Sequence, residues 1–329
     1  MRAIVQTDIG GTDVLEWRQV PDPPMIRGGV LIRTTAVGVN FHDIEIRRQG
    51  ERGLALPFTP GTDVVGIVER VADDVTSIAP GDRVLTLLHN GGYATKVVAH
   101  ARLTVRVPDG VSDEMAASVP VAGLTAWFLT RDTGLAEGSQ VIVHAAAGGV
   151  GTWMGALLRG TSLRTIGLVS SPEKLEVAFE SGYDAVVDRS AHPDIVEAAL
   201  TATRRRGADL VFDAVGGRDF ADSFRMLRPE GTVILYGRAA GPPALTDLPV
   251  AFLDARKNIG LRTFFLSRTM LARMKEVPEA MSALLEVIQK GGAPMRITVL
   301  PLDAAAEAQR LMESRATVGK VVLVSEPSR

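Results

Sequence analysis

The sequence predicts an α/β protein with two domains: a β-rich first third, followed by a doubly wound parallel sheet. The chain has 329 residues, enough to bury two separate hydrophobic cores. Up to about residue 112, β-branched runs alternate with turn residues, which is typical of strands in an antiparallel arrangement. From about residue 140, short apolar runs alternate with helical stretches, which is typical of a parallel sheet covered by helices.

The strands of the first third are predicted from four runs rich in β-branched residues, which are VLIRTTAVGV, VVGIVERV, DRVLTLL and YATKVVA. Turn-forming stretches separate them, namely PDPP, TPGTD, APGD and HNGG. A change follows at Ser112, which can cap a short helix over SDEMAASV. The next stretch, GLTAWFLT, predicts a second helix.

The strand–helix repeats begin with the apolar runs QVIVHA, RTIGLVS, DAVVD, ADLVFDAV and GTVILYG. Between them, PEKLEVAFESG, HPDIVEAALTATRRRG and RDFADSFRMLRPEG have helical spacing, and most end at glycine. This alternation predicts a parallel sheet with helices on both faces. After about residue 263 we expect two more helical stretches and a final strand, GKVVLVSE, which returns to the first domain because a lone strand needs a sheet.

Composition excludes several classes of function. The net charge of −2, with 22% charged and 46% hydrophobic residues, predicts a globular protein with neither nucleic-acid nor membrane partners. Without cysteine there is no disulfide and no thiolate metal site, and no set of histidines and carboxylates has ligand spacing, so we expect no zinc. The N-terminal MRAIVQTDIGG lacks the apolar core of a signal peptide, and VPVAGLTAWFL is shorter than the ~20 residues of a membrane span. We therefore expect a cytoplasmic protein.

The stretch VIVHAAAGGVGTWMGALL predicts a strand, a tight turn and a helix. In the dinucleotide register G-x-G-x-x-G its three positions are Ala146, Gly148 and Gly151. Gly148 would let the backbone approach a pyrophosphate, and Gly151 would let helix and strand pack closely. A tight turn with no ligand also needs glycine, but this turn opens a run of five strand–helix units, which favours a cofactor at the helix N-terminus.

The end of the second predicted strand bears on which dinucleotide binds. An Asp or Glu there would bind a free ribose 2′-hydroxyl, but the sequence continues Ser170, Ser171, Pro172, Glu173 and Lys174. Hydroxyls and an ammonium suit a 2′-phosphate. Helix capping explains Ser171 and Pro172 equally well, but not Lys174, because a cation in the first turn opposes the helix dipole. The sequence therefore favours NADPH.

Several motifs, in this order and spacing, resemble the medium-chain dehydrogenase/reductase superfamily and, within it, the zinc-free NADPH:quinone oxidoreductase (zeta-crystallin-like) group. They are AVGVNFHD, PFTPGTDVVGIV, APGDRV, GGYA, GLTAW, VIVHAAAGGVG, SSPEK, ADLVFDAVGG and SRATVGKVVLV. The resemblance implies a GroES-like substrate domain over residues 1–122, an NADPH-binding Rossmann domain over 123–263 and a return to the substrate domain over 264–329. It also implies an active site in the cleft between the domains and, usually, a homodimer.

The resemblance assigns cofactor contacts to the residues that match the family's motifs. Asn40 would lie near the nicotinamide ribose and Thr125 near the nicotinamide ring. The other contacts it implies are Ala147, Gly148, Gly149, Val150 and Gly151 at the pyrophosphate; Ser170, Ser171, Lys174 and Arg315 at the 2′-phosphate; and Val215, Gly216, Tyr236, Gly237, Phe264, Phe265 and Leu266 beside the nicotinamide. Arg189 stands where relatives often have a tyrosine over the adenosine phosphate; it could hold that phosphate or be a solvated loop charge.

On the substrate side, the places where zinc-dependent relatives carry metal ligands are occupied by Asn40, Thr62 and Asp63. The residues considered for catalysis are Asn40 and the polar candidates for proton transfer, His42, Asp43, Glu45 and Tyr93; solvation or local hydrogen bonding would also explain these last four. Glu45 replaces a tyrosine that relatives carry.

Three functions remain open. The leading one is an NADPH-dependent, zinc-independent reductase that transfers hydride to a quinone or other conjugated carbonyl, because such an acceptor spreads the incoming charge itself and needs no Lewis acid. A polyketide-type enoyl or 2-alkenal double-bond reductase is the alternative, since NFHD followed by the AAAGGVG turn also resembles those domains. The third is a non-catalytic NADPH-binding protein.

Overall fold

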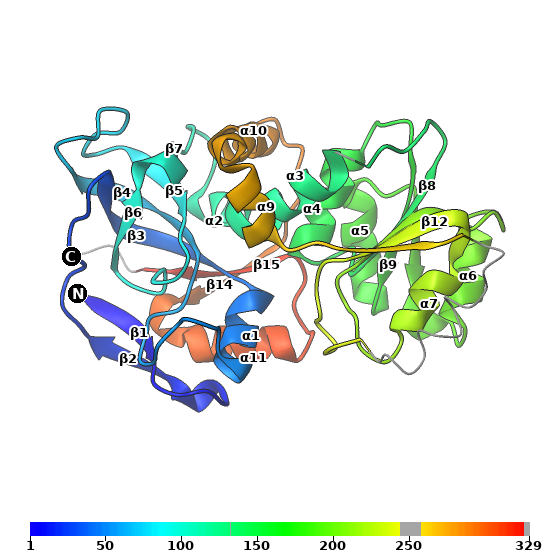
Figure 1. Ribbon diagram of the computed structural model, residues 1–329, viewed down its shortest axis with the longest axis horizontal. Coiled ribbons are helices and arrows are strands. Elements are labelled where there is room, and N and C mark those ends of the chain that lie inside the picture. The colour runs from blue at the N-terminus through cyan, green and yellow to red at the C-terminus, as the bar shows by residue number, and fades with distance from the viewer. Residues whose placement is uncertain (132, 244–257, 326–329) are drawn as a thin grey trace. The chain divides into compact units, whose positions relative to one another are not determined.

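The computed structural model describes residues 1–131, 133–243 and 258–325 (Figure 1). The chain forms two compact units. The first unit contains Met1–Leu124, Arg273–Gly292 and the chain from Arg296 onward, and the second contains Thr125–Ala272 with Ala293–Met295.

The first unit is built on a seven-stranded sheet in the order β14-β15-β3-β4-β5-β7, with β6 also paired to β3, and on a separate two-stranded sheet β1-β2. The strands are β1 (Arg2–Gln6), β2 (Leu15–Gln19), β3 (Gly29–Val39), β4 (Asp63–Val71), β5 (Arg83–Leu87), β6 (Lys96–His100), β7 (Thr104–Arg106), β14 (Ile297–Pro301) and β15 (Lys320–Val324). All pairs are antiparallel except β14 with β15. The four predicted β-branched runs of the first third coincide with β3 to β6.

The end of the chain completes this sheet. β15 pairs antiparallel with β3, with Val321 opposite Val39 and Val324 opposite Ala36. The side chains of Val321 and Leu323 are 2% and 0% exposed and belong to the same hydrophobic cluster as Val37 and Val39 of β3. The strand is apolar because it lies inside the sheet, with β3 on one side and β14 on the other.

The α-helices among the described residues of the first unit are α1 (Phe41–Gln49), α2 (Asp113–Ala116), α10 (Val277–Gln289) and α11 (Ala305–Glu313). Ser112 caps α2 as predicted, because its hydroxyl accepts a hydrogen bond from the Met115 N–H at 3.2 Å. Helix α1 follows directly on β3, so its N-terminus is held at the end of a central strand.

The second unit contains a six-stranded parallel sheet in the order β10-β9-β8-β11-β12-β13. Its strands are β8 (Gln140–His144), β9 (Arg164–Val169), β10 (Ala185–Asp188), β11 (Ala208–Asp213), β12 (Leu227–Leu235) and β13 (Gly260–Thr263). Among the described residues, its α-helices are α3 (Leu124–Arg131), α4 (Gly149–Leu158), α5 (Leu175–Ser181), α6 (Ile195–Ala202), α7 (Phe220–Arg225) and α9 (Leu266–Ala272); the first residue of α3, Leu124, still belongs to the first unit. The predicted α/β class is confirmed; the stretch expected to be one helix over RDFADSFRMLRPEG is instead split, because α7 ends at Arg225 and β12 begins at Leu227.

The strand order of this sheet reverses between β8 and β11, which are neighbours although two strands separate them in the chain. Right-handed crossovers on the two sides of this point place helices on both faces of the sheet. Ligands of such sheets bind outside the carboxyl ends of the strands at the point of reversal. The loops after β8, β11 and β12 are therefore the parts of this unit to inspect for a cofactor site.

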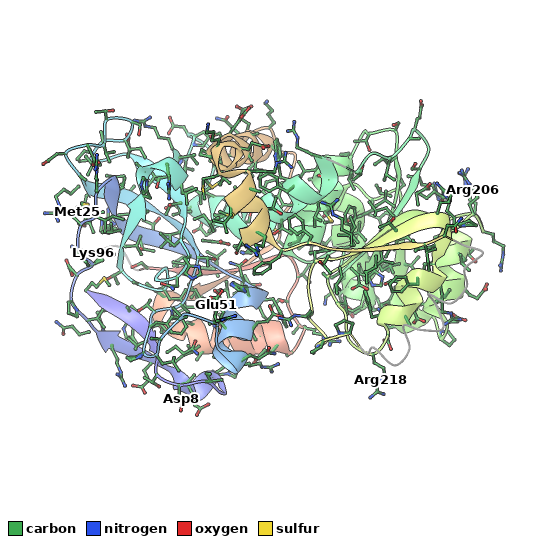
Figure 2. All side chains as sticks on the ribbon, viewed as in Figure 1. Asp8, Met25, Glu51, Lys96, Arg206 and Arg218 are labelled. Atoms are coloured by element: carbon green, nitrogen blue, oxygen red, sulfur yellow. The ribbon has the colours of Figure 1, made fainter. Side chains whose placement is uncertain are left out.

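Both units carry exposed charged side chains. Arg206 and Arg218 are exposed and project from the second unit, as Asp8 does from the first (Figure 2). In the part of the chain that the structure describes, no helix combines the length and apolar character needed to cross a membrane.

Candidate functional site

The turn after β8 is closely packed at Gly151 and open at Gly148. Helix α4 begins at Gly149 with Gly148 as its N-cap residue. A Cβ atom on Gly151 would lie 2.6 Å from the Ala146 carbonyl oxygen, so only glycine allows the helix to pack this closely on the strand. A Cβ on Gly148 would meet only the Ala145 carbonyl oxygen within 4 Å, so the space beside this residue is otherwise open. The turn thus offers backbone N–H groups to an anion with room for it to approach.

The segment after β9 carries the residues predicted for the 2′-phosphate. The Lys174 ammonium donates a hydrogen bond to the Ser170 hydroxyl oxygen at 3.0 Å, so the two groups lie together. Ser171 is the N-cap of the short 3₁₀ turn Pro172–Lys174, but its side chain does not bond to the turn's backbone. Its hydroxyl instead bonds to the Glu173 carboxylate and lowers the pKa of that group. Capping thus accounts for Ser171 by position only, and Lys174 lies against Ser170, the hydroxyl predicted to share the 2′-phosphate with it.

The loops after β11 and β12 are joined by backbone hydrogen bonds. Val215 accepts one from the Ala240 N–H at 2.8 Å, and Gly217 donates one to Gly241 at 3.0 Å. Gly216 has a φ of 59°, which favours glycine, and it is buried. These two loops carry the residues predicted to flank the nicotinamide, which are Val215, Gly216, Tyr236 and Gly237. The hydrogen bonds between the loops therefore hold the two predicted pairs near one another.

The remaining residues predicted for the cofactor are spread over both units. Arg189, after β10, pairs with Asp219 at 3.0 Å, and its side chain is 27% exposed. Phe264 is half-buried, whereas Phe265 is 55% exposed just before α9. Arg315 is exposed, with a φ of 59°, in the first unit. Thr125 is buried in α3 at the start of the second unit.

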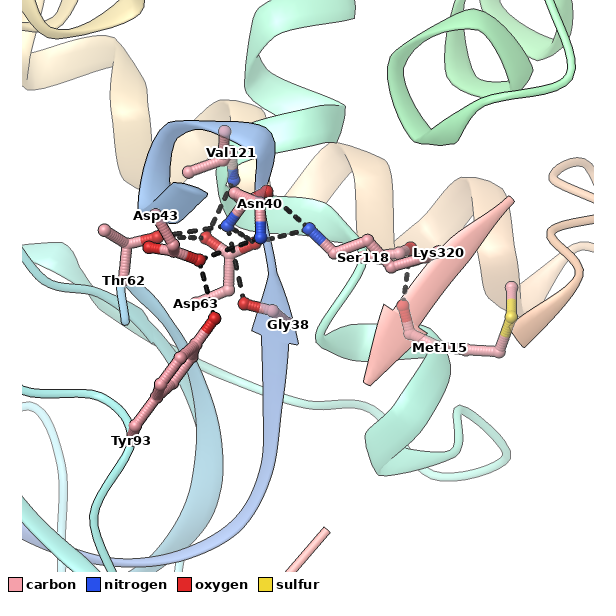
Figure 3. A network of polar contacts seen from close by, with 10 residues as sticks. All are labelled: Gly38, Asn40, Asp43, Thr62, Asp63, Tyr93, Met115, Ser118, Val121 and Lys320. Atoms are coloured by element: carbon pink, nitrogen blue, oxygen red, sulfur yellow. Dashed lines mark hydrogen bonds and ion pairs between the residues drawn. The ribbon is translucent and has the colours of Figure 1, made fainter. Parts of the chain in front are cut away.

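In the first unit, the Asn40 side chain is hydrogen-bonded to a buried ion pair of Lys320 and Asp63 (Figure 3). The Lys320 ammonium donates to the Asp63 carboxylate at 2.9 Å and to the Asn40 carbonyl oxygen at 2.6 Å. Lys320 and Asp63 are 4% and 0% exposed. The Asn40 amide nitrogen in turn donates to Asp63 at 2.9 Å and to Thr62 at 3.2 Å. Because an ammonium only donates, Lys320 fixes which end of the amide faces it.

The Asp63 carboxylate is fully satisfied, since its other oxygen accepts from the Thr62 hydroxyl at 3.1 Å and from the Val121 N–H at 3.2 Å. Gly38 of β3 makes room for this arrangement, because a Cβ there would lie 2.8 Å from Lys320 Cε. The negative charge of Asp63 is thus compensated inside the protein by Lys320. Asn40, Thr62 and Asp63, which the resemblance aligns with metal ligands of zinc-dependent relatives, are all part of this hydrogen-bonded network.

Asp43 and Tyr93, two candidates for proton transfer, are buried and bonded to one another. The Tyr93 hydroxyl donates to the Asp43 carboxylate at 2.8 Å, and the same oxygen accepts the Asn40 backbone N–H at 2.8 Å, which caps α1. Tyr93 is 0% and Asp43 1% exposed. Burial raises the pKa of the Asp43 carboxyl and, together with the Asp43 charge, raises that of Tyr93 well above its usual value. This geometry fits residues that position Asn40.

His42 and Glu45, the other two candidates, are partly exposed on α1. They are three residues apart and therefore lie on neighbouring positions of one helix face. Asp43 lies between them in the sequence and is buried. Of the four candidates, only His42 and Glu45 reach solvent.

The sequence alone did not single out Lys320. Its signal was a lysine at the start of an otherwise apolar strand, where a charge needs a buried partner. Asp63 has the same character at the start of β4. Within residues 1–131, 133–243 and 258–325, no group of three or more histidines, cysteines and carboxylates is placed to hold a metal ion.

Replacing Tyr93 with Phe tests whether its hydroxyl takes part in proton transfer. We expect the free energy of unfolding to fall by about 1 kcal/mol, because one buried hydrogen bond is lost, and the turnover number to stay within about twofold. Urea denaturation and steady-state kinetics check this. A loss of turnover of about 100-fold or more in a folded variant would instead identify Tyr93 as the proton donor.

The first unit also contains a cavity of about 310 Å³ beside the C-terminal end of α1. It is lined by Gln6, Ile9, Gln49, Gly50, Glu51, Arg52, Leu54, Leu56 and Phe58. Asn40 precedes the opposite end of this helix. The cavity is therefore separate from the network around Asn40.

Comparison with known proteins agrees with this geometry. Two family models match: an alcohol dehydrogenase GroES-like domain over residues 26–109 and a zinc-binding dehydrogenase over residues 181–323. A quinone oxidoreductase of Pseudomonas aeruginosa is 31% identical over 96% of this chain and 97% of its own length. A 2-haloacrylate reductase of a Burkholderia species is 31% identical with the same coverage. The crystal structure of Escherichia coli quinone oxidoreductase in complex with NADPH superposes with a TM-score of 0.90 and 27% identity, over 98% of this chain and all of the other.

Similarity to these proteins extends over almost the whole chain. It therefore covers the parallel sheet and glycine turn of the second unit as well as the sheet of the first unit. The three relatives compared above are oxidoreductases. The chain belongs to the medium-chain dehydrogenase/reductase superfamily, in its zinc-free quinone oxidoreductase group.

Proposed function

We propose that the protein is an NADPH-dependent, zinc-independent reductase that transfers hydride to a quinone or another conjugated carbonyl compound. The observation that carries the proposal is the turn at Gly148–Gly151, at the point where the strand order reverses, with Lys174 and Ser170 paired after the next strand. The relatives support it, since the E. coli quinone oxidoreductase was solved with NADPH.

The chain's own residues would bind and orient the cofactor. The N–H groups at the start of α4 would hold the pyrophosphate, and Lys174 with Ser170 would hold the 2′-phosphate. Asn40, whose amide is held by Lys320 and Asp63, would keep a fixed orientation near the nicotinamide ribose or the acceptor. Bound NADPH would supply the hydride, and a proton must come from solvent or from a group that reaches solvent, such as His42 or Glu45.

A conjugated acceptor suits this set of residues better than an alcohol does. Oxidation of an alcohol needs a Lewis acid or base for the hydroxyl proton, which zinc supplies in metal-dependent relatives. Here the corresponding interior is occupied by the pair of Lys320 and Asp63. A quinone or enone carries the incoming charge on its own oxygen and conjugated system, so less stabilisation is required of the protein.

The direct test is an acceptor panel with chelator-treated enzyme. NADPH oxidation should be observed with 1,4-benzoquinone, 9,10-phenanthrenequinone, 2-alkenals or crotonyl thioesters, while NADP⁺ with ethanol or benzyl alcohol should give none. Preference for the enoyl compounds would favour the double-bond reductase, in keeping with the 2-haloacrylate reductase relative. Tight NADPH binding without turnover of any acceptor would identify a non-catalytic binding protein, and robust alcohol oxidation would contradict the proposal.

Glu45 stands where relatives carry a tyrosine, and its charge opposes an acceptor that becomes anionic. Replacing Glu45 with Tyr is therefore expected to raise kcat/KM for simple quinones by about tenfold, the effect of roughly 1.4 kcal/mol on the barrier. Glu45→Gln is the matched control, because it removes the charge without adding an aromatic ring. Lower quinone activity in both variants would indicate that Glu45 assists the reaction.

We further propose that the protein acts in the cytoplasm as a homodimer. The absence of cysteine suits a reducing compartment. Among the described strands, β13 pairs only with β12, and its Leu261 is 41% exposed, so an edge of the second unit's sheet offers backbone groups to a second copy. Light scattering coupled to size-exclusion chromatography should give twice the chain mass of 35.0 kDa.

A further inference from the structure

A buried polar network lies at the carboxyl ends of β8 and β11 in the second unit. The Ser223 hydroxyl, on α7, donates to the Asp213 carboxylate at 2.7 Å and lies 3.2 Å from His144 Nε2. The three residues are 0%, 1% and 2% exposed. They come from the last residue of each of two neighbouring strands and from the helix between β11 and β12.

The direction of the Ser223–Asp213 hydrogen bond determines the tautomer of His144. A hydroxyl has one proton, and Ser223 gives it to Asp213, so His144 must donate through Nε2–H. This arrangement differs from a nucleophilic triad, in which the histidine accepts the serine proton and the carboxylate orients the histidine. Ser223 here connects His144 to Asp213 and is not activated.

Asp213 transmits this anchoring to the adjacent loop. Its other carboxylate oxygen accepts the N–H groups of Val215 at 2.7 Å and Gly216 at 3.0 Å. Its backbone carbonyl accepts the Tyr236 N–H at 2.9 Å, at the start of the loop after β12. Asp213 is therefore bonded to both loops at the carboxyl edge of β11 and β12.

His144 connects the same network to the glycine turn. It is the last residue of β8 and directly precedes the segment that contains Gly148 and Gly151. Ser223 thus links the loop after β8 to the loops after β11 and β12 through side chains that no solvent reaches. These three loops surround the point where the strand order reverses.

We propose that His144, Ser223 and Asp213 are positioning residues that preset these three loops in the geometry that accepts the nicotinamide half of NADPH. The inference rests on the proposed NADPH function. Without the Ser223 hydroxyl, Asp213 and His144 would lose a buried hydrogen-bond partner, and the three loops would adopt other conformations in the absence of ligand. NADPH binding would then have to restore the ordered loop conformation, and the free energy this costs would raise the dissociation constant of NADPH.

Protonation of His144 would add an unpartnered buried N–H at Nδ1, beside the same link. Burial lowers the pKa of His144 from its usual 6.5; the charges of Asp213 and Asp222 oppose this shift, and that of Arg189 adds to it. Within the described chain, His144 Nδ1 has no hydrogen-bond partner, so a proton there would be buried without an acceptor. Because the folded pKa is depressed, the contribution of neutral His144 to stability is full above pH 6.5 and falls as the pH drops below it. The loops of the folded protein are affected only at the lower pH where folded His144 itself takes up a proton.

The test compares Ser223→Ala with Ser181→Ala. Ser181 is equally buried in the same unit, but its hydroxyl bonds only to Val177 within α5. Ser223→Ala should lose more thermal stability than Ser181→Ala, because it leaves two buried polar side chains without a partner, so binding is compared well below both unfolding midpoints. NADPH binding, followed by its fluorescence, should weaken about tenfold or more in Ser223→Ala and stay within about twofold in Ser181→Ala. Ser223→Cys, which keeps the size and a weak donor, should be intermediate and serves if the alanine variant does not fold.

A second ligand separates positioning from a general structural effect. The compound 2′-phospho-ADP-ribose lacks the nicotinamide, so Ser223→Ala should weaken its binding by less than about threefold. In the wild type, the ratio of NADPH to 2′-phospho-ADP-ribose affinity should fall only at a pH well below 6.5, where folded His144 protonates, and His144→Gln, which keeps an N–H but does not titrate, should remove this dependence.

The outcomes separate the two proposals. Wild-type protein that does not bind NADPH overturns both the cofactor and this inference. Wild-type protein that binds NADPH, with Ser223→Ala and Ser181→Ala weakened equally or with both ligands weakened alike, overturns the positioning role and leaves the cofactor in place.

Discussion

Replacing Lys320 with Met is expected to lower the free energy of unfolding by about 3–5 kcal/mol, because it leaves the fully buried Asp63 carboxylate without its cation. The loss should also release the Asn40 amide, whose carbonyl oxygen accepts from Lys320 at 2.6 Å. Turnover should therefore fall more than stability alone explains when it is measured well below the unfolding midpoint. Urea denaturation and steady-state kinetics check both effects.

Lys96→Met is the matched control for this change. Lys96 also lies in a strand of the first unit and pairs with Glu69 at 3.1 Å, but both side chains are about a third exposed. A pair of this kind contributes about 0–1 kcal/mol, so the control should unfold almost as the wild type does. Adding Asp63→Asn to Lys320→Met should recover part of the loss, since the uncompensated charge is removed. Equal, small effects of Lys320→Met and Lys96→Met would contradict the assigned role of the buried pair.

The second large effect is expected on the choice of cofactor. Lys174→Ala should weaken NADPH binding by roughly 10- to 100-fold and leave NADH binding almost unchanged, because a charge-assisted hydrogen bond contributes about 1.5–3 kcal/mol. The pairing of Lys174 with Ser170 at 3.0 Å motivates this choice. Fluorescence titration with both cofactors measures it directly.

Lys290→Ala controls for the general loss of a positive charge, since Lys290 is 74% exposed in an i,i+4 pair with Glu286 in the first unit. Arg315→Ala tests the second cation that the resemblance assigns to the same phosphate, and it should also act on NADPH alone. Equal weakening of NADPH and NADH by Lys174→Ala would show that this residue supports the fold and does not recognise the 2′-phosphate.

Local patterns in the sequence determined the larger part of the fold. Strands of the first third, the strand–helix alternation and the turn at Gly148 and Gly151 could be predicted because each depends on the period of a few neighbouring residues or on space for a Cβ atom. The Ser112 cap is of the same kind, since it involves a residue three positions away. The boundary between α7 and β12 was wrong because helical spacing over RDFADSFRML continues into residues that β11 pairs as a strand.

Only the tertiary structure decided which buried polar groups meet. Lys320 is 257 residues from Asp63 and 280 from Asn40 in the sequence, and His144 is 79 residues from Ser223. No local period reports such pairs, because the sheet order brings their strands together. Asp43 and Tyr93 were candidates for proton transfer in the sequence. The tertiary structure buries both, and Asp43 accepts hydrogen bonds from the Tyr93 hydroxyl and from the Asn40 N–H at the start of α1. The sequence by itself therefore determined most of the elements and the glycine turn at Gly148 and Gly151, whereas packing determined which buried charges are compensated and which buried polar side chains meet.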